Sequence, residues 1–587
     1  MLDLRVYRAA FVPALLAIIV VAFALEGRQA PIAGTPLAPD AFDGRRAIAE
    51  LEALEAAFPD RRPGAPDDER LATRVAATLG QGREFDVSTR RFKAQTAEGE
   101  RTLTTVVAVR QGLDPRRIVV MAHRDALEPG SAAELSGTAA LLELGRVFRV
   151  GRSLRRTLVL VSTSGGTAGL AGARDFAEKP GGEIEAAIVL GDVAGEQTRR
   201  PLVVPWSNAL GAAPAALDDT LRGALRAEVG LRPGGYRLPG RVARLAFPLT
   251  LTEQGALNER GAPAVLISAT GERGPVGERA VSRKRLQSFG RASLRTVTAV
   301  DGVRGDLTEP DADLGIQRKV IPSWSVRLVT GLLILPALLA AVDGFARARR
   351  RRHPVGMWLR WALAGAAPFL LAAALVWALR LVGLIAAPGA PAPAGAVPLD
   401  SAALAAMGSA TLAFILGWIG LRPMLLRALG VSGKPESPGA AAAVILLLVA
   451  VVVLIWVRNP YAAALLLPAL HGWLLAVEPR TRGPRLVLAL VALLALLPVA
   501  LVGLYYMRAF GMSAGELAWM LLLLVAGGGI GLGGLLAWSL LGGCLLSVLA
   551  ILRRKPRRER PEPAASRGPL SYAGPGSLGG SESALRR

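Results

Sequence analysis

Apolar residues are distributed unevenly along this chain of 587 residues. Leu, Ala, Val and Gly dominate residues 320–552, whereas residues 26–319 have the mixed composition of a globular domain. The apolar part divides into runs close to the ~20 residues that a helix needs to cross a bilayer. We therefore predict an all-α transmembrane bundle joined to a separate domain that lies in water.

Eight membrane spans are expected. The first covers residues 9–25, interpreted as a retained signal anchor rather than a cleaved signal peptide, because no convincing small-x-small cleavage site follows it. Seven further spans are expected within residues 320–552, at 322–342, 357–385, 401–421, 440–457, 461–478, 486–507 and 517–552. The last contains the run GGGIGLGG, so it is expected to be one long tilted helix or one broken helix.

Clusters of arginine predict the orientation. The run DGFARARRRRHP follows the span 322–342, and the positive-inside rule places this end in the cytoplasm. The same rule keeps residues 1–8 and the basic tail 553–587 in the cytoplasm, which places residues 26–319 outside it. The tail is rich in Pro, Gly, Ser and Arg and is expected to be disordered. We expect an integral protein of a bacterial-type plasma membrane, with membrane lipids among its partners.

A net charge of +23 could indicate nucleic-acid binding. Only 6 of the 69 basic residues are Lys, and many of the arginines lie beside apolar runs, where they fit membrane orientation. The basic and aromatic pattern of a nucleic-acid groove is missing from the sequence, so no nucleic-acid partner is expected. Cys544 is the only cysteine, which excludes an intramolecular disulfide framework and a cysteine-based zinc site.

From Phe42 onward, helical and strand patterns alternate. Two helices separated by PDRRPGAPDD come first. Runs rich in β-branched residues (TLTTVVAVRQG, RRIVVMAH, TLVLVST, AAIVLGDVAG) then predict strands, with helices expected over 138–149 and 168–178. The pattern predicts an α/β domain with a mixed, mostly parallel sheet flanked by helices. His123 and Asp192 fall at carboxyl ends of strands, where such sheets bind ligands.

Several segments between residues 45 and 270 carry a family resemblance: FPDRRPGAPDDERLATRVAATL, IVVMAHRDA followed by SGTAALLELGRVF, GLAGARDFAEK, IVLGDVAG and RGAPAVLIS. In this order they resemble family twenty-eight of the metallopeptidases, the co-catalytic di-zinc aminopeptidases. The attachment subunit of the eukaryotic GPI transamidase has a similar layout, with a metal-poor peptidase-like domain before its membrane spans. The resemblance implies a zinc-aminopeptidase-like fold for the outer domain.

The family holds two zinc ions about one bridging water, which requires five ligands and a general base. The resemblance places the first histidine ligand at His123 and the later aspartate ligand at Asp192. Asp125 matches the aspartate that orients the histidine, a partner that metal-bound imidazoles usually have. His123 and Asp192 are therefore the expected remnants of a metal site.

Other residues occupy the remaining positions of the family pattern. Ala133 stands at the bridging aspartate, with Glu134 beside it as a further candidate ligand. Gly166 and Thr167 stand where the general base and a glutamate ligand belong, and Gln254 stands at the final histidine. Gly and Thr cannot take a proton from metal-bound water at neutral pH, and Gln is a poor zinc ligand beside imidazole. The resemblance thus implies a zinc site that is largely lost.

These residues predict a membrane-anchored, peptidase-like pseudoenzyme without a tightly bound cofactor, whose outer cleft binds a peptide or protein partner without hydrolysis. One alternative is an active zinc-dependent metalloaminopeptidase with divergent ligands, such as Glu134, Glu253 or Asp192 beside His123. A second is a transport or lipid-handling membrane protein with an accessory outer domain. A serine nucleophile in STSGG is disfavoured because the run lacks the Gly-x-Ser-x-Gly elbow.

Two ionisable residues fall within the expected spans. His471 and Arg380 could line an ion or proton path. A histidine bonded between helices and an arginine reaching the membrane interface are the favoured interpretations.

Overall fold

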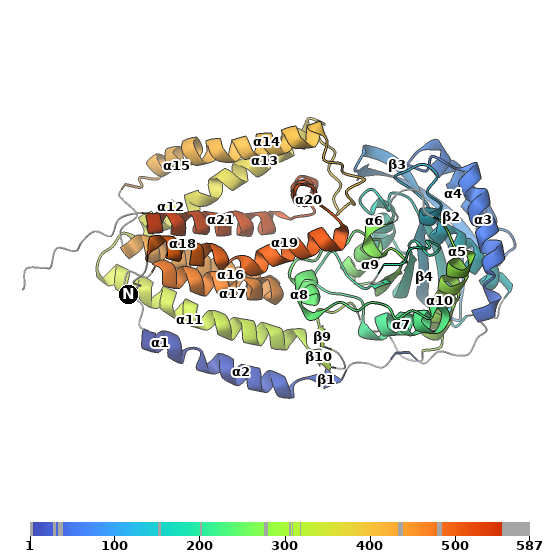
Figure 1. Cartoon of the computed structure of the whole chain (residues 1–587), viewed down its shortest axis with the longest axis horizontal. Helices are drawn as coiled ribbons and strands as arrows, with labels where there is room; N and C mark the ends of the chain where they lie inside the picture. Colours follow the sequence, from blue (N-terminus) through green and yellow to red (C-terminus); the bar gives the residue numbers. More distant parts are fainter. Residues whose placement is uncertain are drawn as a thin grey trace, which may run out of the picture.

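An α/β domain and a helical bundle lie end to end along the long axis of the molecule (Figure 1). The computed structural model describes residues 4–27, 31–32, 39–150, 154–199, 202–274, 280–303, 307, 309–316, 319–432, 438–477 and 484–553. The predictions for the tail, residues 554–587, lie outside this part of the chain.

A seven-stranded sheet forms the centre of the α/β domain, in the order β2-β3-β5-β4-β6-β8-β7. β4 pairs in parallel with β5 and β6, and β6 pairs in parallel with β8, while the pairings at both edges are antiparallel. The predicted mixed sheet is confirmed, with three parallel pairings at its centre and three antiparallel pairings toward its edges. The strands are β2 (Asp86–Thr96), β3 (Gly99–Arg110), β4 (Asp114–His123), β5 (Arg156–Thr163), β6 (Ile184–Leu190), β7 (Val203–Val204) and β8 (Ala264–Ile267).

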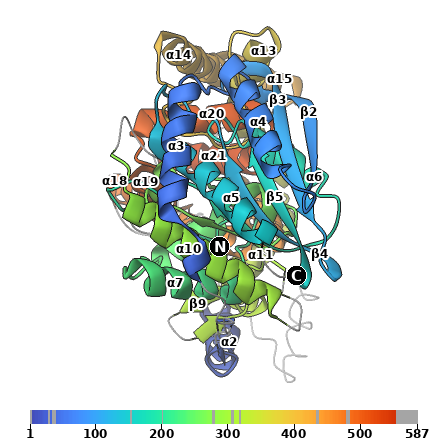
Figure 2. The ribbon, with the colours of Figure 1, turned by 90° about the vertical axis from the view of Figure 1, so that its right-hand side faces the viewer.

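Helices cover both faces of this sheet. The face turned away from the bundle carries α3 (Gly44–Ala57), α4 (Pro66–Leu79), α5 (Ala132–Val150), α7 (Ala215–Val229) and α10 (Arg283–Asp301), as Figure 2 shows. The face turned toward the bundle carries α6 (Ala171–Glu178), α8 (Leu238–Ala246) and α9 (Gln254–Glu259). The predicted flanking helices are therefore confirmed.

Alternate side chains of β4 contribute to different cores, because successive residues of a strand face opposite sides. Ile118 and Val120 pack in the core with α3, α5 and α10. Val119 and Met121 pack in the second core, with α6, α8 and α9. His123 ends the strand two residues after Met121, and this alternation places it on the side of the sheet that faces the bundle.

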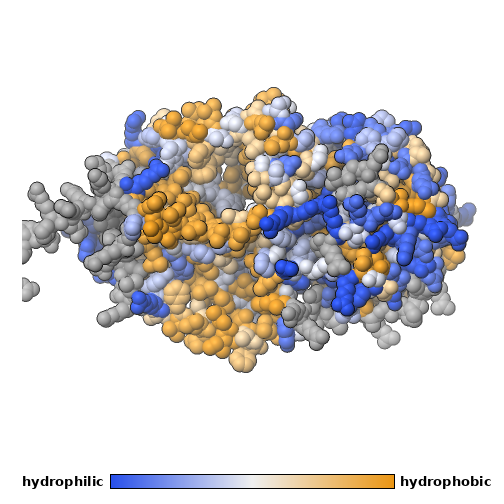
Figure 3. Space-filling view, viewed as in Figure 1, coloured by the Kyte–Doolittle hydropathy of each residue, from blue (hydrophilic) through white to orange (hydrophobic). Residues whose placement is uncertain are grey.

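Six helical segments among the described residues are long and apolar enough to cross a membrane. They are Ser323–Arg350, Val355–Leu381, Ser401–Ala428, Gly439–Arg458, Pro460–Val477 and Leu532–Arg553. The protein is therefore a membrane protein by the length and composition of its helices. Apolar side chains dominate much of the visible surface of the bundle, whereas polar ones dominate the α/β domain (Figure 3).

The bundle is built from α1 (Leu4–Ala9), α2 (Val12–Phe23), α11 (Ser323–Arg350), α12 (Val355–Leu363), α13 (Ala367–Leu381), α14 (Ser401–Leu416), α15 (Arg422–Ala428), α16 (Pro438–Arg458), α17 (Pro460–Val477), α18 (Arg485–Leu494), α19 (Leu497–Phe510), α20 (Ala514–Gly527) and α21 (Leu532–Arg553). α18 and α19 meet at a bend of 47° and together are long and apolar enough for one membrane span. The apolar helix over Tyr7–Phe23 is shorter than the six spans. Eight full crossings stay a prediction.

The predicted span 517–552 is broken into two helices. α20 ends at Gly527 and is followed by Gly528, whose φ of 81° no β-branched or bulky residue adopts easily, and α21 starts at Leu532. α20 is viewed nearly down its axis in Figure 1, while α21 runs along the bundle. Of the two alternatives expected for this segment, the broken helix is the one observed.

A small sheet joins the two halves where the chain enters and leaves the α/β domain. β1 (Glu26–Gly27) pairs with β10 (Lys319–Ile321), which pairs with β9 (Leu314–Ile316). β1 follows α2 and β10 precedes α11, so the two connections to the bundle lie side by side. The limits expected for the outer domain, residues 26 and 319, stay a prediction.

His471 links three helices of the bundle. Its Nε2 lies 3.0 Å from the carbonyl oxygen of Leu333, and its Nδ1 lies 2.7 Å from the hydroxyl of Tyr7. Since a carbonyl only accepts, Nε2 donates to Leu333 and Nδ1 accepts from Tyr7. Arg380 donates to the carbonyl of Ala526, at the end of α20, over 2.7 Å. His471 is thus bonded between α1, α11 and α17, as the favoured interpretation predicts.

Candidate functional site

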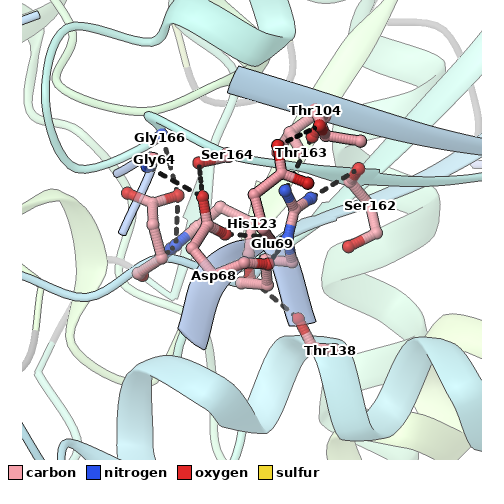
Figure 4. Close-up of polar contacts among 12 residues, drawn as sticks. Gly64, Asp68, Glu69, Thr104, His123, Thr138, Ser162, Thr163, Ser164 and Gly166 are labelled. Atoms are coloured by element: carbon pink, nitrogen blue, oxygen red, sulfur yellow. Dashed lines mark hydrogen bonds and ion pairs between the residues drawn. The ribbon is translucent and has the colours of Figure 1, made fainter. Parts of the chain in front are cut away.

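His123 lies at the carboxyl end of β4, and its ring nitrogen is held by the loop that follows. Nδ1 donates to the main-chain oxygen of Asp125 over 3.0 Å and lies 3.8 Å from that residue's carboxylate. Thr138 donates to the main-chain oxygen of His123 over 2.9 Å, which fixes the strand end against α5 (Figure 4). The main-chain oxygen of Asp125 therefore holds the imidazole, and the expected role of the Asp125 carboxylate in orienting a metal-bound histidine stays a prediction.

The Asp125 carboxylate accepts hydrogen bonds from the turn that follows β5. In the family pattern this turn carries the general base. Oδ1 of Asp125 accepts from the backbone of Gly166 over 3.0 Å, and its Oδ2 accepts from the backbone of Thr167 over 2.9 Å and from the Thr167 hydroxyl over 2.5 Å. Three donors therefore satisfy this fully buried carboxylate.

Gly166 is packed directly against the imidazole. A Cβ atom at this position would lie 2.6 Å from Cβ of His123 and 3.3 Å from Oε1 of Glu253. The side chain of Glu253 thus comes close to the position where a side chain at residue 166 would begin. From the sequence, Glu253 was only an alternative ligand. Its position beside Gly166 depends on how α9, which follows it, packs on the sheet, and the spacing of residues along the chain does not reveal this.

Asp192 and Gln254 lie at the same edge of the sheet. Asp192 follows β6, and its Oδ1 accepts from the backbone of Ala194 over 3.1 Å and of Gly195 over 2.7 Å, so it closes its own loop. Gln254 is fully buried and donates to the carbonyl of Trp206 over 3.2 Å and to the hydroxyl of Thr250 over 3.0 Å. The hydrogen bonds of both side chains therefore hold parts of the fold together.

Two further buried carboxylates, Glu253 and Glu134, act on the charge of His123 after that of Asp125. Burial raises the pKa of Glu134 to about 7, although His123 counteracts this. Burial also raises the pKa of Glu253, whose Oε1 accepts from the hydroxyl of Thr163 over 2.5 Å. Burial alone would lower the pKa of His123, but the carboxylates of Asp125, Glu253 and Glu134 together raise it.

α5 begins at Ala132, six residues earlier than expected, so Glu134 lies in its first turn. Gly137 allows this helix to approach β6, because a Cβ there would lie 2.5 Å from the carbonyl oxygen of Leu190. Ser136 supports the contact by accepting from the backbone of Val193 over 2.9 Å. The Ser-Gly pair of the family pattern therefore has a packing role.

A buried ion pair supports the site from behind, and the sequence did not indicate it. Arg124 and Asp68 are both fully buried, with Nε of Arg124 2.8 Å from Oδ1 of Asp68. Arg124 also donates to the carbonyls of Thr104 and Ser162, and Ser164 donates to Asp68 over 2.5 Å (Figure 4). This network ties α4 to the ends of β4 and β5.

The carboxyl ends of the strands open into a cavity of about 370 Å³. His123, Glu134, Asp192 and Glu253 all line it. The membrane domain closes its other side with Pro393, Ala394 and Gly395, from the connection between α13 and α14, and with Gly511, after α19. The structure therefore brings three of the predicted site residues, His123, Glu134 and Asp192, to one cavity. The sequence did not predict that the membrane domain forms the opposite wall of this cavity.

Part of the outer domain is similar to a known protein family. Residues 105–230 match the family model described as Peptidase family M28. This part of the outer domain is M28-like. The resemblance predicted from the sequence motifs is confirmed, and no curated protein sequence matches the chain.

Solved structures similar to this chain include glutaminyl cyclase from Porphyromonas gingivalis, with 17% identity over 44% of this chain and 98% of that one and a TM-score of 0.35. LapA aminopeptidase from Legionella pneumophila has 14% identity over 47% and 78% of the two chains, with a TM-score of 0.37. BSAP, a zinc aminopeptidase from Bacillus subtilis, has 13% identity over 44% and 94%, with a TM-score of 0.35.

In this M28-like domain, the positions that the resemblance assigns to two zinc ions hold an incomplete set of ligand side chains. Among the residues that the structure describes, no group of three His, Cys, Asp or Glu side chains is arranged to hold a metal ion. At the positions that the resemblance assigns, Gly166 offers no donor atom and the side-chain nitrogen of Gln254 is bonded to Trp206 and Thr250. The arrangement offers instead a cavity lined by carboxylates beside one imidazole.

Proposed function

We propose that this membrane protein uses its M28-like outer domain to bind a peptide or protein segment without hydrolysing it. Gly166 carries the proposal. It stands where the family pattern has its general base, and the packing of His123 against it leaves no room for a longer side chain. A carboxylate within reach of the attacked bond is what a water-activating peptidase requires at this place.

The cavity retains the properties of a binding site. Its volume of about 370 Å³ is in the range of ligand pockets, ~300–1,000 Å³. Its apolar lining includes Leu127, Val189, Leu251 and Leu266, which supply contact surface for side chains. Polar side chains from α5, from the turn after β5 and from the residue before α9 also line it and would fix the orientation of a ligand.

The proposal is tested on the purified full chain in detergent. Zinc content is measured by elemental analysis, and an alanine-rich peptide with a free N-terminus serves as the probe. Expected results are saturable binding of the peptide, no dependence of binding on a chelator, and an intact peptide after prolonged incubation.

The second candidate is an active metalloaminopeptidase, favoured by the closeness of Glu253 to Gly166 and of both Glu253 and Glu134 to His123. Under this alternative the same preparation would release N-terminal residues, chelation would stop the release, and His123→Ala would abolish it. That result would replace the proposed function.

A further inference from the structure

One arginine of the helical bundle has no acceptor for its guanidinium group. Arg422 is the first residue of α15 and lies near the end of the apolar span Ser401–Ala428. Its Nε and Nη2 atoms are buried, and within the described residues neither has a hydrogen-bond partner. Burying a charged group without a partner costs free energy, and the cost is greatest where hydrocarbon replaces water. An anion bound from outside the chain would offset this cost.

The acidic side chains of the membrane domain do not supply that anion. In the described part of residues 319–553 they are Asp343, Asp400 and Glu516. Asp343 forms an ion pair within α11, and Asp400 and Glu516 accept hydrogen bonds from the backbone at the starts of α14 and α20. These described carboxylates therefore leave the positive charge of Arg422 unbalanced.

Two tryptophan rings hold the Arg422 guanidinium in place. The guanidinium carbon lies 4.5 Å from the ring centre of Trp418 and 5.3 Å from that of Trp361 in α12. Trp418 belongs to a π-helical turn, η4 (Gly417–Leu421), which interrupts the span between α14 and α15. Turns of this kind are rare and are frequently found at functional sites. The rings attract a cation, but they carry no net negative charge that would balance it.

The surroundings of Arg422 suit a membrane lipid. Ile419 and Met424 are 65% and 60% exposed, so apolar surface for acyl chains lies on the same helical segment. The Arg422 side chain is only partly buried, which leaves it within reach of a molecule at the surface of the bundle. Arg360 of α12 donates to the carbonyl of Leu429 over 2.7 Å and brings a second positive charge to the end of α15. Basic sites between membrane helices attract anionic headgroups.

We propose that Arg422 binds the phosphate group of an anionic phospholipid whose acyl chains lie against α14 and α15. A phosphate diester carries one negative charge and has only acceptor oxygens, which complements the N–H donors of a guanidinium. Positive charges at Arg360 and Arg427 favour a headgroup without a cation of its own. α12 and α15 lie at the end of the bundle away from the outer domain (Figure 1). The lipid site is thus separate from the cavity beside His123 and goes beyond the proposed function.

Thermal unfolding of the full chain in detergent, measured against the concentration of three probes, tests the proposal. The probes are phosphatidylglycerol, a diacylglycerol with the same acyl chains, and inorganic phosphate. A ligand that binds only the folded chain raises the melting temperature as its concentration rises above the dissociation constant. We expect this rise with phosphatidylglycerol, and not with diacylglycerol or inorganic phosphate at the same concentration.

The variant Arg422→Gln removes the positive charge and is expected to weaken the apparent affinity for phosphatidylglycerol about 10-fold or more, because a hydrogen bond between two charged groups is lost. Arg427→Gln is the matched control, since it removes one exposed positive charge from the same helix and should keep the affinity. The readout is the rise that the lipid causes, so a variant with a lower melting temperature still reports. The three probes on the unaltered chain need no variant.

An equal rise with diacylglycerol would overturn the inference, because the phosphate group would then contribute nothing. An equal rise with inorganic phosphate would overturn the lipid as its source. Equal losses of affinity in Arg422→Gln and Arg427→Gln would also count against it, since the lipid would then respond to the overall charge of this surface. These outcomes leave the proposed function in place, because the peptide-binding cavity lies in the other half of the molecule.

Discussion

At the scale of single residues, Gly166 leaves little room for a side chain beside His123. A Cβ at this position would lie 2.6 Å from Cβ of His123, an atom held close to the backbone. Gly166→Ala is therefore expected to lower the free energy of unfolding by ~1–3 kcal/mol through overpacking. Gly166→Glu should destabilise at least as much and should not create peptidase activity. Thermal unfolding and a peptide-release assay check both variants, and zinc-dependent release by the Glu variant would contradict this account.

Glu134 makes stability depend on pH. Its pKa is raised by burial from an ordinary 4.5 to about 7. Between these values the unfolded chain loses the proton while the folded chain keeps it, so stability falls as pH rises through this window. Above pH 7 the loss reaches ~3 kcal/mol, at 1.36 kcal/mol per pKa unit. Glu134→Gln should thus raise the melting temperature at pH 8 and change it little at pH 4.5; an equal effect at both pH values would be evidence against a raised pKa.

His123, Asp125 and Asp192 predicted where the site lies. They stand at or just after the carboxyl ends of β4 and β6, and the ends of neighbouring parallel strands meet at one edge of a sheet. The sequence did not assign Glu253 a place beside Gly166, because that approach depends on how α9 docks on the sheet. Nor did it indicate the pairing of Arg124 with Asp68, whose positions are 56 residues apart and meet only through tertiary packing.

At the scale of elements, patterning predicted the strands and the flanking helices, since each buries one continuous face. The start of α5 at Ala132 was missed because its first turn, AAELSG, lacks the apolar periodicity used to recognise helices. The break between α20 and α21 follows from Gly528, where a left-handed backbone ends the first helix.

One buried ion pair fastens the outer domain to α19. Arg244 pairs with Glu272, with side-chain exposures of 1% and 5%, and Arg244 donates to the hydroxyl of Tyr505 over 3.0 Å. The Arg244 guanidinium also lies 5.2 Å from the ring centres of Tyr506 and Phe510. The attachment of α19 therefore depends on a charge that has no access to water.

Glu272→Ala should cost ~3–5 kcal/mol, because it leaves Arg244 buried without its counter-charge. The matched control is Glu178→Ala, which removes an exposed pair with Arg260 and should cost ~0–1 kcal/mol. Melting of the full chain in detergent measures both. If the two variants lost similar amounts, the buried pair would not be what holds α19 to the outer domain.

At the scale of the whole molecule, the cavity belongs to both domains. Its floor comes from the strand ends of the M28-like domain and its opposite wall from Pro393–Gly395 and Gly511. A soluble enzyme with the same sheet would open this edge to water, whereas here the edge faces the ends of membrane helices (Figure 1). The membrane domain therefore limits which ligands reach His123. Membrane helices attached to the opposite edge of the sheet would leave the cavity open to water.

We predict that the outer domain and the arginine-rich end of α11 lie on opposite sides of the bilayer. α11 has 28 residues and is about 42 Å long at 1.5 Å per residue, more than the ~30 Å hydrocarbon core. It starts directly after β10 and ends at Arg347, Arg349 and Arg350, so the positive-inside rule places that end in the cytoplasm. Cysteines introduced singly at Glu52 and Arg350, both exposed, report the two sides.

An impermeant maleimide should label Glu52→Cys in intact cells and Arg350→Cys only after the membrane is opened. The native Cys544 gives no competing signal, because it is fully buried in the bundle. Labelling of both positions in intact cells would mean that α11 does not cross. Labelling of Arg350→Cys alone would invert the chain and place the cavity in the cytoplasm, where ligands of the outer leaflet could not reach it. The orientation therefore decides which side of the membrane supplies the ligand, whatever its chemistry.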